Sequence, residues 1–373
     1  MTWFSYWIED RGFGIVADFG RSRLRIVCKE ADCRVELFNG KIVLVEDKPH
    51  RWAYHYGRAV LRHAQEHKTT LSELVNRAFA RLRKLDEWFI SRGYKPLVLF
   101  SGGKDSLVVL DLCYRYFGSD FYVAYIHIPG NTHEECDWYV LCTVEKYLNS
   151  PRRFYYLYRT EPIRLGSLGI ELSPDEFDRL LVYISLAIHP RDVRARKCMV
   201  YYKVEVMKQV PKHFVFISGA RASDGLWRTL YMQQMHDGMF KSPVLMHWTL
   251  ELIYDWPREA VLEYIKLNNL KLNPLYEKIS HSGNCMICPA HFSSVEKILL
   301  YLNKLERYYP HWYKKVLDFM RQYMQYHRER VKCNMPCSRC PYLRDKNRYI
   351  MAKRIGVVLE LLDNSIVKYL QKS

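Results

Sequence analysis

The chain has 373 residues, of which 49% are hydrophobic, and its formal net charge is +17. This apolar content excludes a wholly disordered protein, and charged residues interrupt the apolar runs before any reaches the roughly 20 residues of a membrane-spanning helix. The positive balance favours a polyanionic partner such as nucleic acid, although a solvated basic surface has the same composition. The first 18 residues lack the apolar stretch of a signal peptide, so we expect a cytoplasmic protein with no membrane partner.

Residues 1–50 predict a small β-rich module. Short apolar or alternating runs at 14–17, 24–27 and 41–45 are separated by turn signals. The dipeptide Asn39-Gly40 is typical of a tight hairpin turn. Residues 51–95 predict a helical linker, because apolar side chains recur there at helical spacing.

From Pro96 the pattern changes to alternating strands and helices. Runs at 96–100, 121–128, 154–158 and 214–218 predict buried strands, and 105–117 and 132–148 predict helices between them. Strands and helices that alternate through short links indicate βαβ units. We therefore expect an α/β fold with a doubly wound parallel sheet in a nucleotide-binding domain over 96–290. A helical region with cysteines follows over 291–373.

The turn after the first of these strands predicts a phosphate site. Its two central glycines allow positive φ and let backbone amides approach an anion closely. Its serines and lysine add donors and charge, and the next helix points its free amides at the same place. Asp105 would cap that helix or help to hold Mg²⁺. The expected loop consists of Ser101, Gly102, Gly103, Lys104, Asp105 and Ser106. Its glycine spacing excludes the Walker A pattern.

Two further positions follow predicted strands and are expected at the same sheet edge. Arg221 comes after an apolar strand and Gly219, where a guanidinium can clamp a phosphate, and a surface salt bridge is the alternative. Asn131 follows the second strand and can contact ribose, adenine or metal. The alternative there is a simple helix cap, in which Thr132 and Glu135 form a capping box.

The chain has 11 cysteines, and five of them lie in two late clusters. An odd number in a cytoplasmic protein argues against a disulfide framework. Cys285-x-x-Cys288 and the later Cys337-x-x-Cys340, with Cys333 as an alternate, can converge on one metal. Four thiolates suit Zn²⁺ or an iron–sulfur cluster equally well.

Ser-Gly-Gly-Lys-Asp-Ser resembles the signature of PP-loop ATP pyrophosphatases, which cleave ATP between the α and β phosphates. Further segments resemble, in order, the phosphoadenosine phosphosulfate reductase family within that group. These segments are Arg196-Lys197-Cys198 with Lys203, Ile217–Ser223, Ile253–Trp256, Asn273–Tyr276 and Gly283–Pro289. The resemblance covers about residues 96–289.

The resemblance implies ATP with Mg²⁺ as ligand, and Lys104, Asp105 and Arg221 as the catalytic groups. It also implies a [4Fe–4S] cluster beside the nucleotide, with Cys198 as another alternate ligand and Zn²⁺ as the alternative metal. The chain departs from the family at Asp224, which is offset from the expected acidic position. Its intact loop, and the lack of any cysteine beyond Cys340, favour ATP as substrate over a sulfonucleotide.

The segment 301–330 interleaves aromatic and basic residues, as RNA-binding surfaces do, although an amphipathic helix with a buried aromatic face has the same pattern. We therefore expect an enzyme that adenylates an acceptor so that sulfur can be transferred to RNA, as in the thiolation of a tRNA. One alternative is a phosphoadenylyl or adenylyl sulfate reductase with an iron–sulfur cluster. The other is a non-catalytic nucleic-acid-binding protein with structural zinc.

Overall fold

The structure is a computed structural model of the whole chain. It describes residues 3–9, 12–18, 23–29, 32–38, 42–46, 70–165, 169–185, 197–224, 237–242, 245–292, 294–331 and 346–363. Within residues 3–46 the description covers the backbone. None of the helices in these ranges is both long and apolar enough to cross a bilayer.

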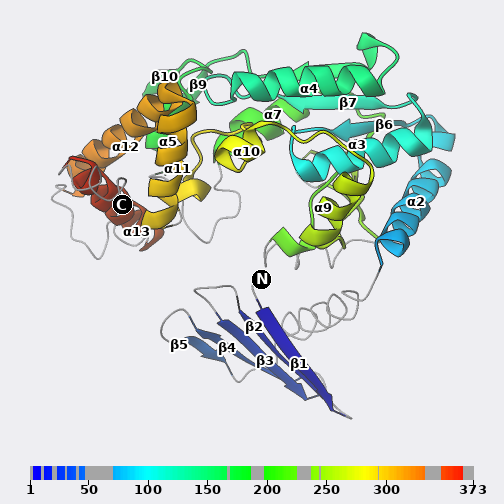
Figure 1. Ribbon diagram of the computed structural model, residues 1–373, viewed down its shortest axis with the longest axis horizontal. Helices are drawn as coiled ribbons and strands as arrows, with labels where there is room; N and C mark the ends of the chain where they lie inside the picture. Colours follow the sequence, from blue (N-terminus) through cyan, green and yellow to red (C-terminus); the bar gives the residue numbers. More distant parts are fainter. Residues whose placement is uncertain are drawn as a thin grey trace.

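The N-terminal strands form an antiparallel meander in which each strand pairs with the next (Figure 1). They are β1 (Trp3–Glu9), β2 (Gly12–Asp18), β3 (Arg23–Lys29), β4 (Asp32–Phe38) and β5 (Ile42–Glu46). β4 pairs antiparallel with β5, as the predicted hairpin requires, while Asn39-Gly40 itself lies outside the described residues. The β-rich start of the chain is therefore a five-stranded sheet.

The central sheet has six strands in the order β12-β13-β11-β6-β7-β8. Its members are β6 (Lys95–Leu99), β7 (Tyr122–Ile126), β8 (Phe154–Leu157), β11 (Phe214–Ser218), β12 (Met239–Lys241) and β13 (Trp248–Glu251). All neighbours pair in parallel except β12 with β13. The order extends from β6 to β8 in one direction and from β11 to β13 in the other, so the predicted doubly wound α/β fold is confirmed.

Both faces of this sheet are covered, as the continuous apolar strands require. Val98 and Val123 belong to the larger core cluster, whereas their neighbours Leu97 and Ala124 belong to a second cluster on the opposite face. The helices up to α10 are α2 (Leu71–Trp88), α3 (Lys104–Phe117), α4 (Glu134–Tyr147), α5 (Phe177–Ser185), α6 (Lys197–Met199), α7 (Glu205–Met207), α9 (Arg258–Leu267) and α10 (Leu275–Ile279). A π-helical segment, Val200–Val204, joins α6 to α7, and β9 (Ile163–Leu165) pairs with β10 (Ile170–Leu172).

Helix α2 is tied to the core by a buried ion pair. Thr70 and Glu73 form a capping box that starts the helix. Further along the same helix, the Arg81 guanidinium, 4% exposed, makes two hydrogen bonds of 2.7 and 2.8 Å to the Asp255 carboxylate. A third, of 3.0 Å, reaches the Leu252 carbonyl oxygen. This arrangement satisfies both buried charges.

The C-terminal helices pack side by side, as Figure 1 shows at its left. They are α11 (Val295–Tyr308), α12 (Pro310–Val331) and α13 (Lys346–Asp363). Tyr301, Trp312 and Tyr323 are buried in the common core. For these three aromatic residues, the alternative of an amphipathic helix with a buried aromatic face is confirmed.

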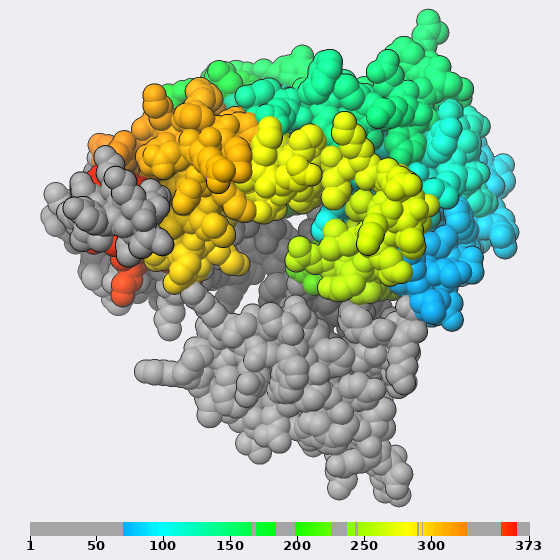
Figure 2. Space-filling model, in the orientation of Figure 1, coloured from blue at the N-terminus to red at the C-terminus, as the bar shows by residue number. Residues whose placement is uncertain are grey.

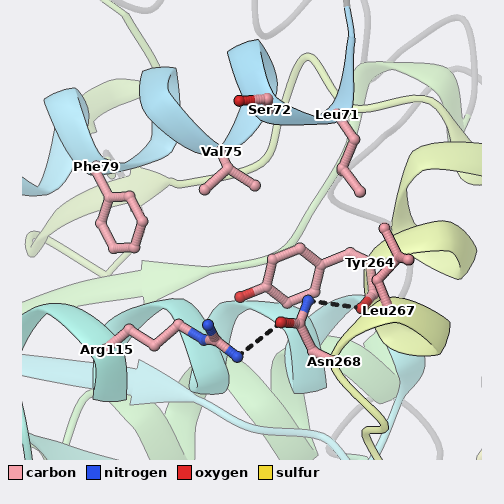
Figure 3. Close-up of a pocket in the computed structure, with 8 residues that line it drawn as sticks. All are labelled: Leu71, Ser72, Val75, Phe79, Arg115, Tyr264, Leu267 and Asn268. Atoms are coloured by element: carbon pink, nitrogen blue, oxygen red, sulfur yellow. Dashed lines mark hydrogen bonds between the residues drawn. The ribbon is translucent and has the colours of Figure 1, made fainter.

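A separate cavity of about 520 Å³ lies between α2, α3 and α9 (Figure 3). Apolar side chains such as Val75 and Phe79 form one wall, and Arg115 donates a 2.8 Å hydrogen bond to Asn268 at the other. None of the residues predicted to bind phosphate lines this cavity.

Candidate functional site

The candidate site lies where the chain leaves two adjacent parallel strands in opposite directions. The loop Ser101–Ser106 follows β6, and Gly219 to Arg221 follow β11, which pairs directly with β6. β7, the next strand after β6, lies on one side of the β6–β11 pair. β12 and β13, the strands that follow β11, lie on the other side. Open α/β sheets bind ligands at such a switch point, outside the carboxyl ends of the strands.

The loop has the backbone conformation that its glycines predict. Gly102 has φ +72° and is packed against Cys136 and Val140, so a side chain at that position would be both strained and crowded. Gly103 is the N-cap of α3, which begins at Lys104. The Ser106 hydroxyl donates to the Gly103 carbonyl oxygen at 2.9 Å and accepts from the Ser101 amide at 3.2 Å. Ser106 therefore holds the loop closed over the first turn of the helix.

Two cations share the carboxylate of Asp105. Lys104 Nζ lies 2.5 Å from Oδ2 of Asp105, and Arg221 Nε lies 2.8 Å from Oδ1. Asp224 Oδ1 holds the other side of the guanidinium at 2.6 Å from Arg221 Nη2. The structure thus brings Lys104, Asp105 and Arg221, the three predicted catalytic residues, into contact.

The Arg221 guanidinium is buried but not fully satisfied. Its side chain is 5% exposed. Nε lies 2.8 Å from Asp105 Oδ1 but is not aligned for a hydrogen bond, and Nη1 makes no hydrogen bond with any residue that the structure describes. A buried donor without an acceptor costs about 1–3 kcal/mol. This cost is relieved if an anion enters the site and accepts from these atoms.

Gly219 is needed because β11 passes very close to α3. A Cβ atom at this position would lie 2.9 Å from the Asp105 carbonyl oxygen and 3.2 Å from the Ser106 amide nitrogen. Both are backbone atoms of the first helical turn and cannot move aside independently. Gly219 therefore sets the distance between the loop and Arg221.

A segment from far along the chain covers the loop. Asn273 Nδ2 donates to the Gly102 carbonyl oxygen at 3.3 Å, and the Tyr276 hydroxyl accepts from the Lys104 amide at 3.2 Å. Burial raises the pKa of Tyr276, so its hydroxyl stays protonated. In Figure 2 the surface is hollowed between α9 (yellow-green) and α10 (yellow), the helix that carries Tyr276. Sequence reasoning identified Asn273 and Tyr276 within the family resemblance but assigned them no role.

Asn131 follows β7 as predicted, but its side chain binds the loop of residues 284–288, the Cys285 loop. It is fully buried. Its Oδ1 accepts from the Ile287 amide at 2.6 Å, and its Nδ2 lies 3.1 Å from Cys285 Sγ. Nearby, Asn284 Nδ2 donates to the Ile126 carbonyl oxygen at 3.1 Å. Asn131 therefore holds the loop with Cys285 over the end of β7, beside the strand that leads to Ser101–Ser106.

The first helical turn after β7 also differs from the expected capping box. The Thr132 hydroxyl accepts from the Ile128 amide at 2.8 Å and contacts the Asn284 carbonyl oxygen at 3.3 Å. The N-cap of α4 is His133, whose Nδ1 accepts from the Glu135 amide at 3.0 Å. The expectation that Thr132 caps this helix is wrong, because its hydroxyl is used to bind the Cys285 loop.

Of the predicted metal ligands, the structure describes Cys285, Cys288 and Cys198. Hydrogen bonding to Cys288 and burial raise the pKa of Cys285, while the positive charge of Lys203 opposes that rise. Cys198 is close enough to Cys285 to interact with it electrostatically. Among the described residues, no three or more His, Cys, Asp or Glu side chains converge as a metal site does. Cys333, Cys337 and Cys340 lie outside the described residues.

Three stacked rings, those of His281, His291 and Tyr301, contact the Cys285 loop. His281 stacks on His291 at 4.7 Å between ring centroids, and His291 stacks on Tyr301 at 4.9 Å. The Tyr301 hydroxyl donates to the Met286 carbonyl oxygen at 2.8 Å. Burial, and secondarily His291, lower the pKa of His281 to about 3, so this ring is neutral.

No family model and no curated protein matches this chain. Among solved structures, it is similar to a phosphoadenylyl-sulfate reductase from Candida auris, with 13% identity, a TM-score of 0.34, and 56% of this chain and 91% of that chain covered. For a Candida glabrata FMN adenylyltransferase the values are 12%, 0.37, 61% and 68%.

A third similar structure is the U34-tRNA thiolase NcsA from Methanococcus maripaludis with its [4Fe–4S] cluster. It has 17% identity and a TM-score of 0.30, with 66% of this chain and 76% of that chain covered. The fold class itself follows from the strand order and from the glycine loop at the end of β6. The chain is an α/β protein with a glycine loop, Ser101–Ser106, at the switch point of its sheet.

Proposed function

We propose that this protein binds ATP with Mg²⁺ at the Ser101–Ser106 loop and cleaves it between the α and β phosphates, which adenylates an acceptor. The observation that carries this proposal is the buried Arg221 guanidinium beside the N-terminus of α3, whose Nη1 makes no hydrogen bond with any described residue and whose Nε lies 2.8 Å from Asp105 Oδ1 without hydrogen-bond alignment. Donors of this kind, fixed in place before a ligand arrives, stabilise charge that develops on phosphate oxygens. The intact glycine loop supports ATP over a sulfonucleotide.

In the proposed reaction, an acceptor oxygen attacks the α phosphorus and pyrophosphate leaves. Lys104 and Arg221 would take the charge that develops on the leaving pyrophosphate, together with the amides of the first turn of α3. Mg²⁺, held by the Asp105 carboxylate, would neutralise further phosphate charge. No side-chain nucleophile is required, since positioning and charge stabilisation supply the rate enhancement.

We further propose that the acceptor is an RNA, such as a tRNA, and that the activated position receives sulfur. The net charge of +17 supports a polyanionic partner. Cys285 and Cys288 are adjacent thiols over the end of β7, and they would supply two ligands to a [4Fe–4S] cluster or to Zn²⁺. Cys337 and Cys340 are proposed to complete the set. A cluster bound there would supply sulfur or electrons next to the nucleotide.

The test is product analysis with radiolabelled ATP. The proposal expects AMP and pyrophosphate, with pyrophosphate release stimulated by tRNA, and it expects Lys104→Met to lower that release about 100-fold. The matched control is Lys146→Met, an exposed lysine on α4. ADP as product, or equal rates in both variants, would contradict the proposal. Sulfite release from an adenylyl sulfate would instead identify a reductase.

The metal proposal has its own readout. Anaerobically purified protein is expected to contain iron and to absorb in the visible range, and the Cys285→Ser variant is expected to lose both. Cys113→Ser, a buried thiol on α3, serves as the control. A colourless protein with one zinc would replace the cluster by Zn²⁺. A protein with neither metal would reject the site.

A further inference from the structure

Three aromatic rings meet at the carboxyl ends of β7 and β8. His127 directly follows β7, Tyr156 lies within β8 and Tyr158 follows it. His127 and Tyr156 are stacked at 5.7 Å between centroids, with planes 24° apart. Tyr158 is edge-on to His127 at 6.5 Å. Tyr156 is 37% exposed and Tyr158 is 48% exposed, so solvent reaches this group of rings.

Asp137 selects the tautomer of the neutral histidine ring. Both Asp137 oxygens lie 3.1 Å from His127 Nδ1, and Oδ1 also accepts from the Tyr125 hydroxyl at 2.8 Å. The Tyr156 hydroxyl reaches the same oxygen at 3.3 Å. Because a carboxylate can only accept, Nδ1 carries the hydrogen in neutral His127, and Nε2 remains an acceptor. Nε2 makes no hydrogen bond with any residue in the described part of the chain.

These rings lie on the same sheet edge as the candidate site. The neighbouring strands are in the order β8, β7, β6 and β11, all parallel. The His127 amide donates to the Leu157 carbonyl oxygen at 2.8 Å, which holds the ends of β7 and β8 together. Neighbouring strands are about 4.8 Å apart, so the ends of β7 and β8 lie one and two strand spacings from the end of β6, where the Ser101–Ser106 loop begins. The Cys285 loop also contacts the end of β7.

We propose that His127, Tyr156 and Tyr158 form a stacking site for one unpaired base of a single-stranded RNA. Exposed tyrosine rings stack on any base, and Nε2 of His127 would accept a hydrogen bond from an N–H group on the base edge. The net charge of +17 attracts the RNA backbone. This inference rests on the proposed function where it makes that base part of the acceptor.

The first experiment maps the contact directly. A 12-nucleotide single-stranded RNA that contains 4-thiouridine is bound to the full chain and irradiated, and the tryptic peptides are analysed by mass spectrometry. Cleavage after Arg153 and after Arg159 releases the peptide Phe154–Arg159. A crosslink on Tyr156 or Tyr158 is the expected result. Crosslinks confined to other peptides would overturn the assignment, including those on the basic segment 301–330.

The second experiment measures affinity by fluorescence anisotropy with the same RNA. Tyr158→Leu removes an exposed ring whose hydroxyl makes no hydrogen bond with any described residue, and it is expected to weaken binding about tenfold. Tyr114→Leu is the control, because this tyrosine on α3 is similarly exposed, at 39%, and lies outside the ring group. His127→Phe keeps a ring and removes the acceptor. It should reduce binding of an oligouridine but not of an oligo-N3-methyluridine, which has no N3–H.

The two proposals can fail separately. ATP cleavage without RNA contact at these rings would refute the stacking site and leave the nucleotide site standing. RNA contact at Tyr156 and Tyr158 without ATP cleavage would do the reverse. Equal RNA affinities of the wild type, Tyr158→Leu and Tyr114→Leu would also overturn the stacking site. Circular dichroism and ATP affinity establish that each variant is folded.

Discussion

Replacement of Asp105 by Asn tests whether its carboxylate occupies the place of a phosphate. The two oxygens of Asp105 lie 2.5 Å from Lys104 Nζ and 2.8 Å from Arg221 Nε. The variant preserves the shape of the side chain and removes its negative charge. Two unit charges 4 Å apart interact by about 1 kcal/mol in water and by about 4 kcal/mol at an effective dielectric constant of 20. Pyrophosphate binding without Mg²⁺ should therefore strengthen by at least about 1 kcal/mol, which is about fivefold.

The assay is isothermal titration calorimetry with pyrophosphate in the presence of a chelator. Mg²⁺-dependent ATP cleavage by the same variant should fall about 100-fold, because the proposed metal ligand is lost. Asp120→Asn is the control for net charge, since Asp120 is 84% exposed and pairs with Arg153 at the surface. Weaker or unchanged pyrophosphate binding by Asp105→Asn would refute the view that this carboxylate competes with phosphate.

Three further predictions concern the surroundings of the loop. Gly219→Ala places a Cβ 2.9 Å from the Asp105 carbonyl oxygen, so it should lower the free energy of unfolding in urea by about 1–3 kcal/mol and abolish ATP binding. Gly93→Ala is the control: φ there is +88° and no described atom lies within 4 Å of the added carbon, so this variant measures the cost of backbone strain alone. Tyr276→Phe removes the hydroxyl that accepts from the Lys104 amide and should change ATP affinity several-fold in calorimetry with little change in melting temperature, so an unaltered affinity would count against a role for Tyr276 at the loop. Folding lowers the pKa of His281 from 6.5 to about 3, so the unfolded state binds the proton more tightly and the free energy of unfolding should decline as pH falls from 6.5 towards 3. His281→Gln should flatten the dependence of the melting temperature on pH in this range. An unchanged slope would contradict the assignment.

The parts of the site that sequence predicted are those set by local chemistry. Two glycines between an apolar strand and a helix allow few conformations, and Gly102 adopts the positive φ that they favour. Gly219 and Arg221 were expected at the same edge because they follow a strand. Their contact with Asp105 depends on β11 pairing directly with β6, which the sequence pattern leaves open.

The parts that sequence could not place depend on contacts between distant segments. Tyr276 meets the loop from 172 positions away. Asn131 was expected to face the ligand, but its side-chain amide makes its hydrogen bonds with Cys285 and Ile287, which lie 154 and 156 positions later. Asn and Thr side chains satisfy several kinds of partner equally well, so their residue type does not determine which partner they meet. The short strand Trp248–Glu251 also gives too brief an alternation to predict.

The buried ion pair between Arg81 and Asp255 limits how far the chain can be truncated from its N-terminus. A fragment that began at Pro96 would match the expected start of the nucleotide-binding domain, but it would leave the Asp255 carboxylate, 6% exposed, without its guanidinium. Loss of one partner from a buried ion pair costs about 3–5 kcal/mol, a large share of the stability of an ordinary domain. Any shortened version made for crystallisation or labelling therefore has to retain α2 and its Thr70 cap.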